Sequence, residues 1–99
     1  MIAGISTALS GLAAASKRTN YTANNIANAS TPGYRPYNPQ NVSTNGGVTV
    51  IPNQKETAMP VDLGKEIVDL AVNETSYKAN LKTLQAIDDM QGQLLDIKS

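Results

Sequence analysis

Prolines divide this chain into three parts, and that division limits what it can fold into. All five prolines lie between residues 32 and 60, together with several glycines. A proline inside a helix removes a backbone hydrogen bond and clashes with the preceding turn, so no long helix can cross this stretch. The flanking parts carry apolar residues at helical spacing. We therefore predict one mainly α domain, with an N-terminal helix in residues 1–28, a connecting segment in 29–60 and a C-terminal helix in 61–99.

The N-terminal part carries a seam of residues whose spacing alternates between three and four. This spacing is typical of a helix that packs lengthwise against another helix. The first half of the seam is aliphatic, and the second half is mostly small or polar. Several alanines flank the seam and permit close backbone approach. The seam consists of Ile2, Ile5, Leu9, Leu12, Ser16, Thr19, Ala23 and Ile26.

The C-terminal part carries a second seam, which drifts around the helix as a straight period of about 3.6 residues does. Asp62 follows the last proline and is a suitable N-cap for this helix. Tyr77 lies on the seam and Asn80 lies off it. Glu74 and Lys78 form a favourably oriented pair one turn apart. The seam consists of Leu63, Ile67, Leu70, Tyr77, Leu81, Leu84, Ile87, Leu94 and Ile97.

The two seams predict an antiparallel coiled coil within one subunit. The expected contacts join Ile2, Ile5, Leu9 and Leu12 of the first seam to Leu81, Leu84, Leu94 and Ile97 of the second. The chain has no Trp and no Phe, and much of its apolar content is alanine, so one subunit alone can build only a thin core. We therefore expect the Ala-rich flank and the remaining apolar stripe to face neighbouring subunits.

The connecting segment contains one turn signal followed by a β-type run. Asn45-Gly46-Gly47 precedes residues 48–51, whose valines, threonine and isoleucine favour a strand. Residues 41–43 are able to pair with that strand as a small hairpin. Two strands alone are barely stable, so an irregular segment is the other interpretation of this composition.

A second turn signal follows the N-terminal helix. Thr31-Pro32-Gly33-Tyr34 fits a type II turn, because proline presets φ at the second position and glycine supplies a positive φ at the third. One interpretation of the asparagines before it is a helix stop, since their amides can cap free carbonyls. The other is a polar cluster that bonds to a neighbouring element and sets the direction of the loop. These asparagines are Asn24, Asn25 and Asn28.

Composition argues against several classes of function. The chain has no His and no Cys, which removes the usual general base, the commonest transition-metal ligand and any thiolate site. We expect no enzyme, no metal and no cofactor. The net charge is zero and the basic residues are dispersed, which indicates no nucleic-acid partner. No apolar run is long enough to span a bilayer, and the N-terminal run lacks the basic start of a signal peptide.

The two ends of the chain resemble the terminal signatures of bacterial flagellar rod and hook proteins. The N-terminal resemblance rests on Ser-Gly-Leu at 10–12, Arg18, Ala-Asn-Asn-Ile-Ala-Asn at 23–28 and Thr-Pro-Gly-Tyr at 31–34. The C-terminal resemblance rests on Val-Asp-Leu at 61–63, Glu-Ile-Val-Asp-Leu at 66–70, Tyr-Lys-Ala-Asn at 77–80, Leu-Gln at 84–85 and Asp-Asp-Met at 88–90. The two signatures occur in the order that the family has them.

The resemblance implies an axial coiled coil of the terminal helices, with copies stacked helically into a hollow tube that crosses the periplasm. It implies that the Asn-rich loop contacts other subunits, and that export uses the flagellum-specific secretion apparatus without a cleaved signal peptide. The partners would be further copies, other rod proteins and the export apparatus. Such a basal-body subunit transmits torque and keeps an export channel open. Because distal rod and hook proteins carry large domains between their termini, this chain is most similar to a short proximal-rod protein.

The alternative to a rod subunit is a helical-hairpin adaptor or export-partner protein of the flagellar system. Such a protein would hold a fixed stoichiometric partner and would not polymerise.

Overall fold

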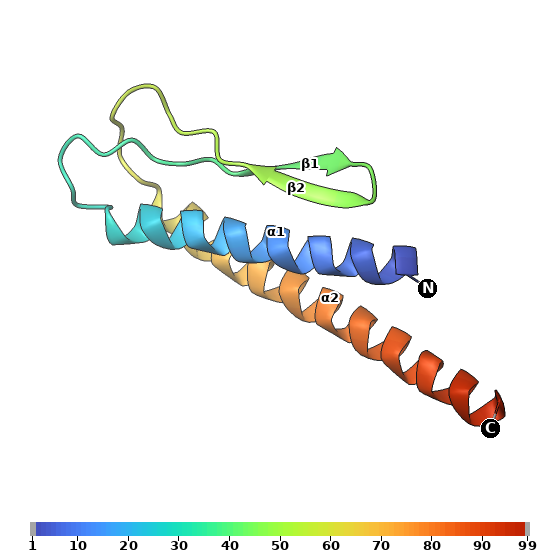
Figure 1. The fold of residues 1–99 in the computed structure, drawn as a ribbon. Coiled ribbons are helices and arrows are strands. Elements are labelled where there is room, and N and C mark those ends of the chain that lie inside the picture. Colours follow the sequence, from blue (N-terminus) through green and yellow to red (C-terminus); the bar gives the residue numbers. More distant parts are fainter. Residues whose placement is uncertain (1, 99) are drawn as a thin grey trace.

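The computed structural model describes residues 2–98, and the side chains of residues 4–92 within them. Two antiparallel helices, α1 (Ile2–Ala27) and α2 (Leu63–Lys98), form an elongated pair, and the whole molecule measures 63 × 24 × 14 Å (Figure 1). The strands β1 (Gln40–Thr44) and β2 (Gly47–Ile51) form a two-stranded antiparallel hairpin between them in sequence. The predicted mainly α architecture and the hairpin are both confirmed.

The first turn of α2 is capped as the sequence predicts. The Asp62 carboxylate accepts a hydrogen bond from the backbone N–H of Lys65 at 3.2 Å, and its carbonyl accepts one from Glu66 at 3.0 Å. An N-cap side chain satisfies one of the backbone donors that a helix start leaves free. Further along, Glu74 and Lys78 form the predicted ion pair at 3.0 Å.

The connecting segment is an ordered antiparallel strap. The hairpin register pairs Gln40 with Ile51 and Thr44 with Gly47. Beyond the hairpin the two arms remain paired, because Asn38 N–H donates to the Asn53 carbonyl at 3.0 Å. The hairpin lies alongside α1 (Figure 1). Ser10 holds the strap there, because its Oγ accepts a hydrogen bond from the Val48 backbone N–H at 3.1 Å. The hairpin interpretation is therefore confirmed.

The helices face each other in four layers that are seven residues apart on each helix. In the first layer Gly4 lies against Ile87, and in the second Gly11 lies against Asn80. A Cβ added to Gly11 would meet Asn80 Oδ1 at 2.6 Å, so only glycine fits there without a shift. The third and fourth layers are hydrogen-bonded pairs: Arg18 with Asn73, and Asn25 with Glu66. Heptad spacing on both helices keeps these pairs in antiparallel register.

The centre of the helix pair consists mostly of residues outside the two predicted seams, although Ile87 of the second seam does face Gly4. The buried side chains of α1 are small or polar: Ala8, Ala14, Ala15, Thr22 and Asn25. Leu9 is 51% exposed and Leu81 is 41% exposed, so these two predicted seam residues do not form a buried core. Of the flanking alanines, Ala8, Ala14 and Ala15 lie inside the subunit, whereas Ala13 is exposed. The small side chains let the backbones of the two helices approach closely. Bulky side chains such as Leu9 and Leu81 are therefore left on the surface.

Two further features concern the helix ends. α2 has 36 residues against 26 in α1, and its C-terminal end runs past the start of α1 (Figure 1). The side chains of Ile2, Leu94 and Ile97, which were predicted to meet, fall outside the described part. Over residues 2–98, no helix combines the length and hydropathy that a membrane crossing requires.

Candidate functional site

Asn25 lies at the junction of α1, the strap and α2, and it is fully buried. Its Nδ2 donates hydrogen bonds to the Tyr37 carbonyl at 2.8 Å and to Glu66 Oε1 at 3.1 Å. Its Oδ1 accepts hydrogen bonds from the Tyr37 N–H at 2.9 Å and the Tyr34 hydroxyl at 2.7 Å. A carboxamide has two donors and two acceptor lone pairs, so all four are used. The amide therefore locks the loop onto both helices.

The sequence allowed two interpretations of the three asparagines, a helix stop or a polar cluster that bonds to a neighbouring element. In the structure each interpretation holds for different asparagines. Asn25 bonds to neighbouring elements and sets the direction in which the loop leaves the helix. Asn28 and Asn24 act as the helix stop, because Asn28 Nδ2 donates to the Asn24 carbonyl at 2.9 Å and to Asn24 Oδ1 at 3.0 Å. Thr31 then donates to Asn28 Oδ1 at 3.1 Å, which ties the turn to the helix end.

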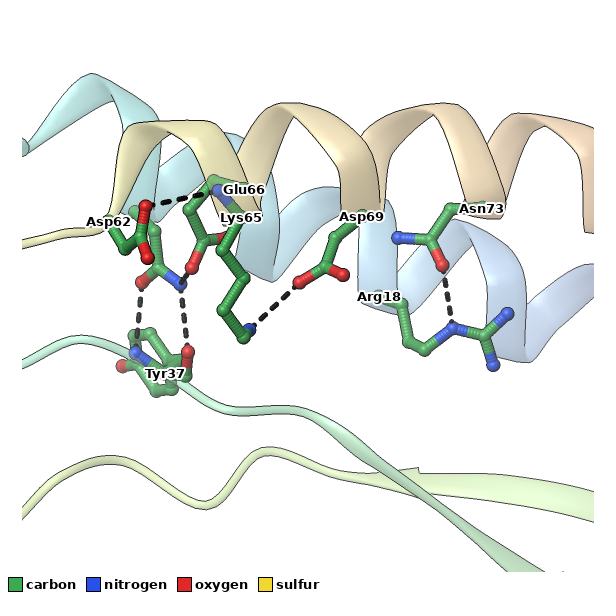
Figure 2. Close-up of polar contacts among 8 residues, drawn as sticks. Arg18, Tyr37, Asp62, Lys65, Glu66, Asp69 and Asn73 are labelled. Carbon is green, nitrogen blue, oxygen red and sulfur yellow. Dashed lines mark hydrogen bonds and ion pairs between the residues drawn. The ribbon is translucent and has the colours of Figure 1, made fainter.

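Glu66 is a buried carboxylate that receives its hydrogen bond from Asn25. Burial raises the pKa of Glu66, and the hydrogen bond from Asn25 opposes this only in part. The neighbouring Lys65 turns instead to Asp69, at 2.9 Å, which raises the pKa of that lysine (Figure 2). The carboxylate that ties the two helices together is therefore held at an electrostatic cost.

The raised pKa of Glu66 predicts a specific pH dependence of stability. The folded chain binds a proton here more readily than the unfolded chain does. The stabilising contribution is therefore complete below pH 4.5, the ordinary value, and is lost as the pH rises through the raised pKa. We expect the urea midpoint to increase as the pH falls from neutral towards that value, and Glu66→Gln to flatten this increase. Equal slopes in both chains would contradict the assignment.

The predicted type II turn is present at Thr31-Pro32-Gly33-Tyr34. Gly33 has φ +75°, and the Tyr34 N–H donates to the Thr31 carbonyl at 3.3 Å. Pro32 and Gly33 are exposed, while Tyr34 is half-buried and its hydroxyl reaches back to Asn25. Burial is the main cause of a raised pKa of Tyr34, so its hydroxyl stays protonated as a donor.

Substitution at Gly33 separates backbone strain from steric contact. A Cβ there would meet nothing within 4 Å, so only the positive φ opposes a side chain. We expect Gly33→Val to lower the free energy of unfolding by about 1–2 kcal/mol. Gly33→Asn should cost clearly less, because asparagine tolerates this conformation. Urea titrations of the two variants measure the difference, and equal losses would mean that the turn does not hold its conformation in solution.

Arg18 joins both helices to the strap. Its Nε donates to Asn73 Oδ1 at 2.8 Å between the helices (Figure 2). One of its terminal nitrogens donates to Asn41 Oδ1 on β1. Neither Asn73 nor Glu66 was predicted as a site residue. One signal was available, since the polar positions 66, 73 and 80 repeat every seven residues along a helix that packs against another.

Exposed apolar side chains of the α2 seam lie beside the small and polar residues of the α1 seam on the outer side of the helix pair. They flank an open groove of about 650 Å³ between the second half of α1 and the first half of α2. No residue of the strap lines it. Ile67 is 60% exposed and Tyr77 is 44% exposed on its α2 wall. The lining residues are Ser16, Thr19, Asn20, Ile67, Leu70, Ala71, Asn73, Glu74 and Tyr77.

The other predicted seam residues continue this outer side. Leu63 is exposed at the start of α2, and Leu81 is exposed beyond Tyr77. Leu9 is exposed on α1, whereas Ile5, Leu12 and Leu84 are half-buried. Among the described residues, no group of three or more His, Cys, Asp or Glu side chains is placed to hold a metal ion.

Comparison with known protein families gives two matches, one at each end of the chain. Residues 5–35 match the family described as flagella basal body rod protein. Residues 58–97 match the family described as flagellar basal body rod FlgEFG protein C-terminal. Together the matches cover more than two thirds of the chain, and they include the Asn25 junction and all of the groove lining. A search of curated proteins finds no match.

Proposed function

The chain belongs to the flagellar rod and hook protein family, and on that premise we propose that its copies assemble through the apolar groove side into a hollow helical tube. Its role in the basal-body rod is structural. The tube transmits torque and carries export, and other rod proteins and the export apparatus are its further partners.

One observation carries the proposal: the interior of the subunit is small and polar, and the bulky apolar residues are outside. A chain that folds to work alone buries its large apolar side chains first, because they contribute the most on leaving water. Here Ile67, Tyr77 and Leu81 stay exposed while Ala15 and Thr22 are buried. Burial of the exposed set requires contact with another molecule.

The buried Asn25 junction also supports the role of a structural rod subunit. It holds the loop, the strap and both helices in one fixed arrangement, so that every copy presents the same groove. A helical tube requires identical contacts at every step, because small errors in subunit shape accumulate along it. A rigid joint between the helices and the loop meets that requirement.

Fractionation of cells tests the proposal directly. An antibody to the chain should detect it in detergent-resistant basal bodies, with many copies in each. Recovery only in the cytoplasm, in a complex of fixed stoichiometry with one partner, would reject the rod subunit and favour the adaptor. Sedimentation of the purified chain adds a second reading, since concentration-dependent association is expected and a monomer at all concentrations is not.

A further inference from the structure

α2 exposes a second face, separate from its groove wall, whose chemistry differs from that of the groove. At one point this face borders the rest of the subunit, because Val72 also lines a polar pocket with Arg18 and Thr22 of α1. Its residues recur at spacings of three and four and are all exposed. Val68 is 60% exposed and Val72 is 55% exposed, so this face has apolar surface of its own. None of its members is charged, although charged residues occur on the other sides of α2. We call it the outer ridge; it consists of Val68, Val72, Thr75, Ala79, Thr83 and Ala86.

The groove has properties that select its occupant. Its α2 wall carries the large exposed side chains Ile67 and Tyr77, with Leu70, Ala71, Asn73 and Glu74 between them in the sequence. Its one charged residue is Glu74, which is already paired with Lys78 at 3.0 Å. An occupant with a charge would therefore have no free counter-charge to meet, and that charge would be desolvated at a cost. The groove favours an uncharged helix with small side chains.

We propose that the outer ridge of one copy packs into the apolar groove of the next copy. This inference rests on the proposed function and identifies the two surfaces that assembly would join. Ridges of one helix pack into grooves between residues of another when side-chain sizes are complementary. Small ridge residues bring the α2 backbone close to the groove walls and cover Ile67 and Tyr77, and no charge is buried unpaired.

The pairing has a consequence for symmetry. The ridge and the groove are different surfaces of one chain, so the contact between copies is heterologous. A contact of this type leaves a free ridge at one end and a free groove at the other, and it builds an open helical series unless the rotation closes a ring. A groove-to-groove contact would instead be isologous and would stop at a dimer.

Engineered cysteines test the pairing, because the natural chain has none. Cells co-express Ser16→Cys, in the groove, with Ala79→Cys or Ala86→Cys, on the ridge, and are treated with a short bismaleimide. We expect at least one ridge position to give cross-linked dimers with Ser16→Cys, in yield about tenfold above a control. The control pairs Ser16→Cys with Ser43→Cys, an exposed position on β1. Each variant expressed alone should give no more than the control.

The outcomes separate this inference from the proposed function. Dimers from Ser16→Cys alone would show groove-to-groove contact and overturn the ridge pairing. So would the absence of ridge cross-links while the chain is recovered in basal bodies, and in both cases the rod role would stand. Absence of the chain from basal bodies, with no cross-links, would overturn both. Cross-links at one ridge position but not the other would support the pairing and set its axial offset.

Discussion

Asn25→Ala is expected to lower the free energy of unfolding by about 3 kcal/mol or more. This loss is larger than the one expected for Gly33→Val in the turn. The substitution removes a fully buried amide and leaves the Tyr37 N–H, the Tyr37 carbonyl, the Tyr34 hydroxyl and Glu66 without their partner. Each buried polar group left unpaired costs about 1–3 kcal/mol, and water entering the space recovers part of the sum. Urea denaturation followed by circular dichroism measures the loss.

Asn24→Ala is the matched control for this experiment. Asn24 is the neighbouring asparagine and is exposed, and its side chain bonds only within the last turn of α1, to Asn28. Surface substitutions of this type change stability by about 0.5 kcal/mol or less. Equal losses in the two variants would mean that the four hydrogen bonds of Asn25 do not hold the loop. Asn25→Asp gives a further comparison, because a carboxylate lacks the donors and would face Glu66 with a like charge.

Ile67→Asp is expected to abolish association between copies while the subunit stays folded. The side chain is 60% exposed in the single chain, so the free energy of unfolding should change by about 0.5 kcal/mol or less. In a covered groove the carboxylate would be buried and unpaired, at a cost of several kcal/mol. A loss of about 3 kcal/mol corresponds to roughly a hundredfold weaker association. Sedimentation and the urea midpoint, measured on the same sample, separate the two effects.

Ser43→Asp serves as the control, because it introduces the same charge at an exposed position of β1, away from the groove. It should leave association within twofold of the natural chain. If Ile67→Asp associates as the natural chain does, the groove is not the contact surface. If it unfolds, the outward position of Ile67 is not held in solution.

The sequence predicted the helix boundaries, the N-cap and the turns correctly, because each of these features depends on a few adjacent residues. The five prolines bound the two helices, and Asp62 caps the second one. Asn45-Gly46-Gly47 marks the hairpin, and Gly33 supplies the positive φ of the turn. The ion pair of Glu74 and Lys78 follows from spacing alone. In each case a short stretch of backbone has few alternatives, so residue type decides the conformation.

The faces of the helices could not be assigned in the same way. Apolar periodicity marks the side of a helix that leaves water, but it does not distinguish burial within a subunit from burial between subunits. Leu9, Ile67 and Leu81 carry the periodic signal and are exposed in the single chain. Ala15 and Thr22 carry almost none of it and are buried. For these residues the signal therefore marks the exposed side of the helix pair and not the interior of the fold.

By itself, the sequence determined the two helices, the hairpin, the turn and the family to which the chain belongs. The tertiary structure decided which residues the helices use to meet: the layers from Gly4 and Ile87 to Asn25 and Glu66. The physical reason is that close packing depends on backbone approach and paired hydrogen bonds. The layer residues repeat every seven positions on each helix, but this repeat does not say which residues meet, because the partners lie far apart in the chain. The Asn25 amide is satisfied only when α1, the strap and α2 are all in place.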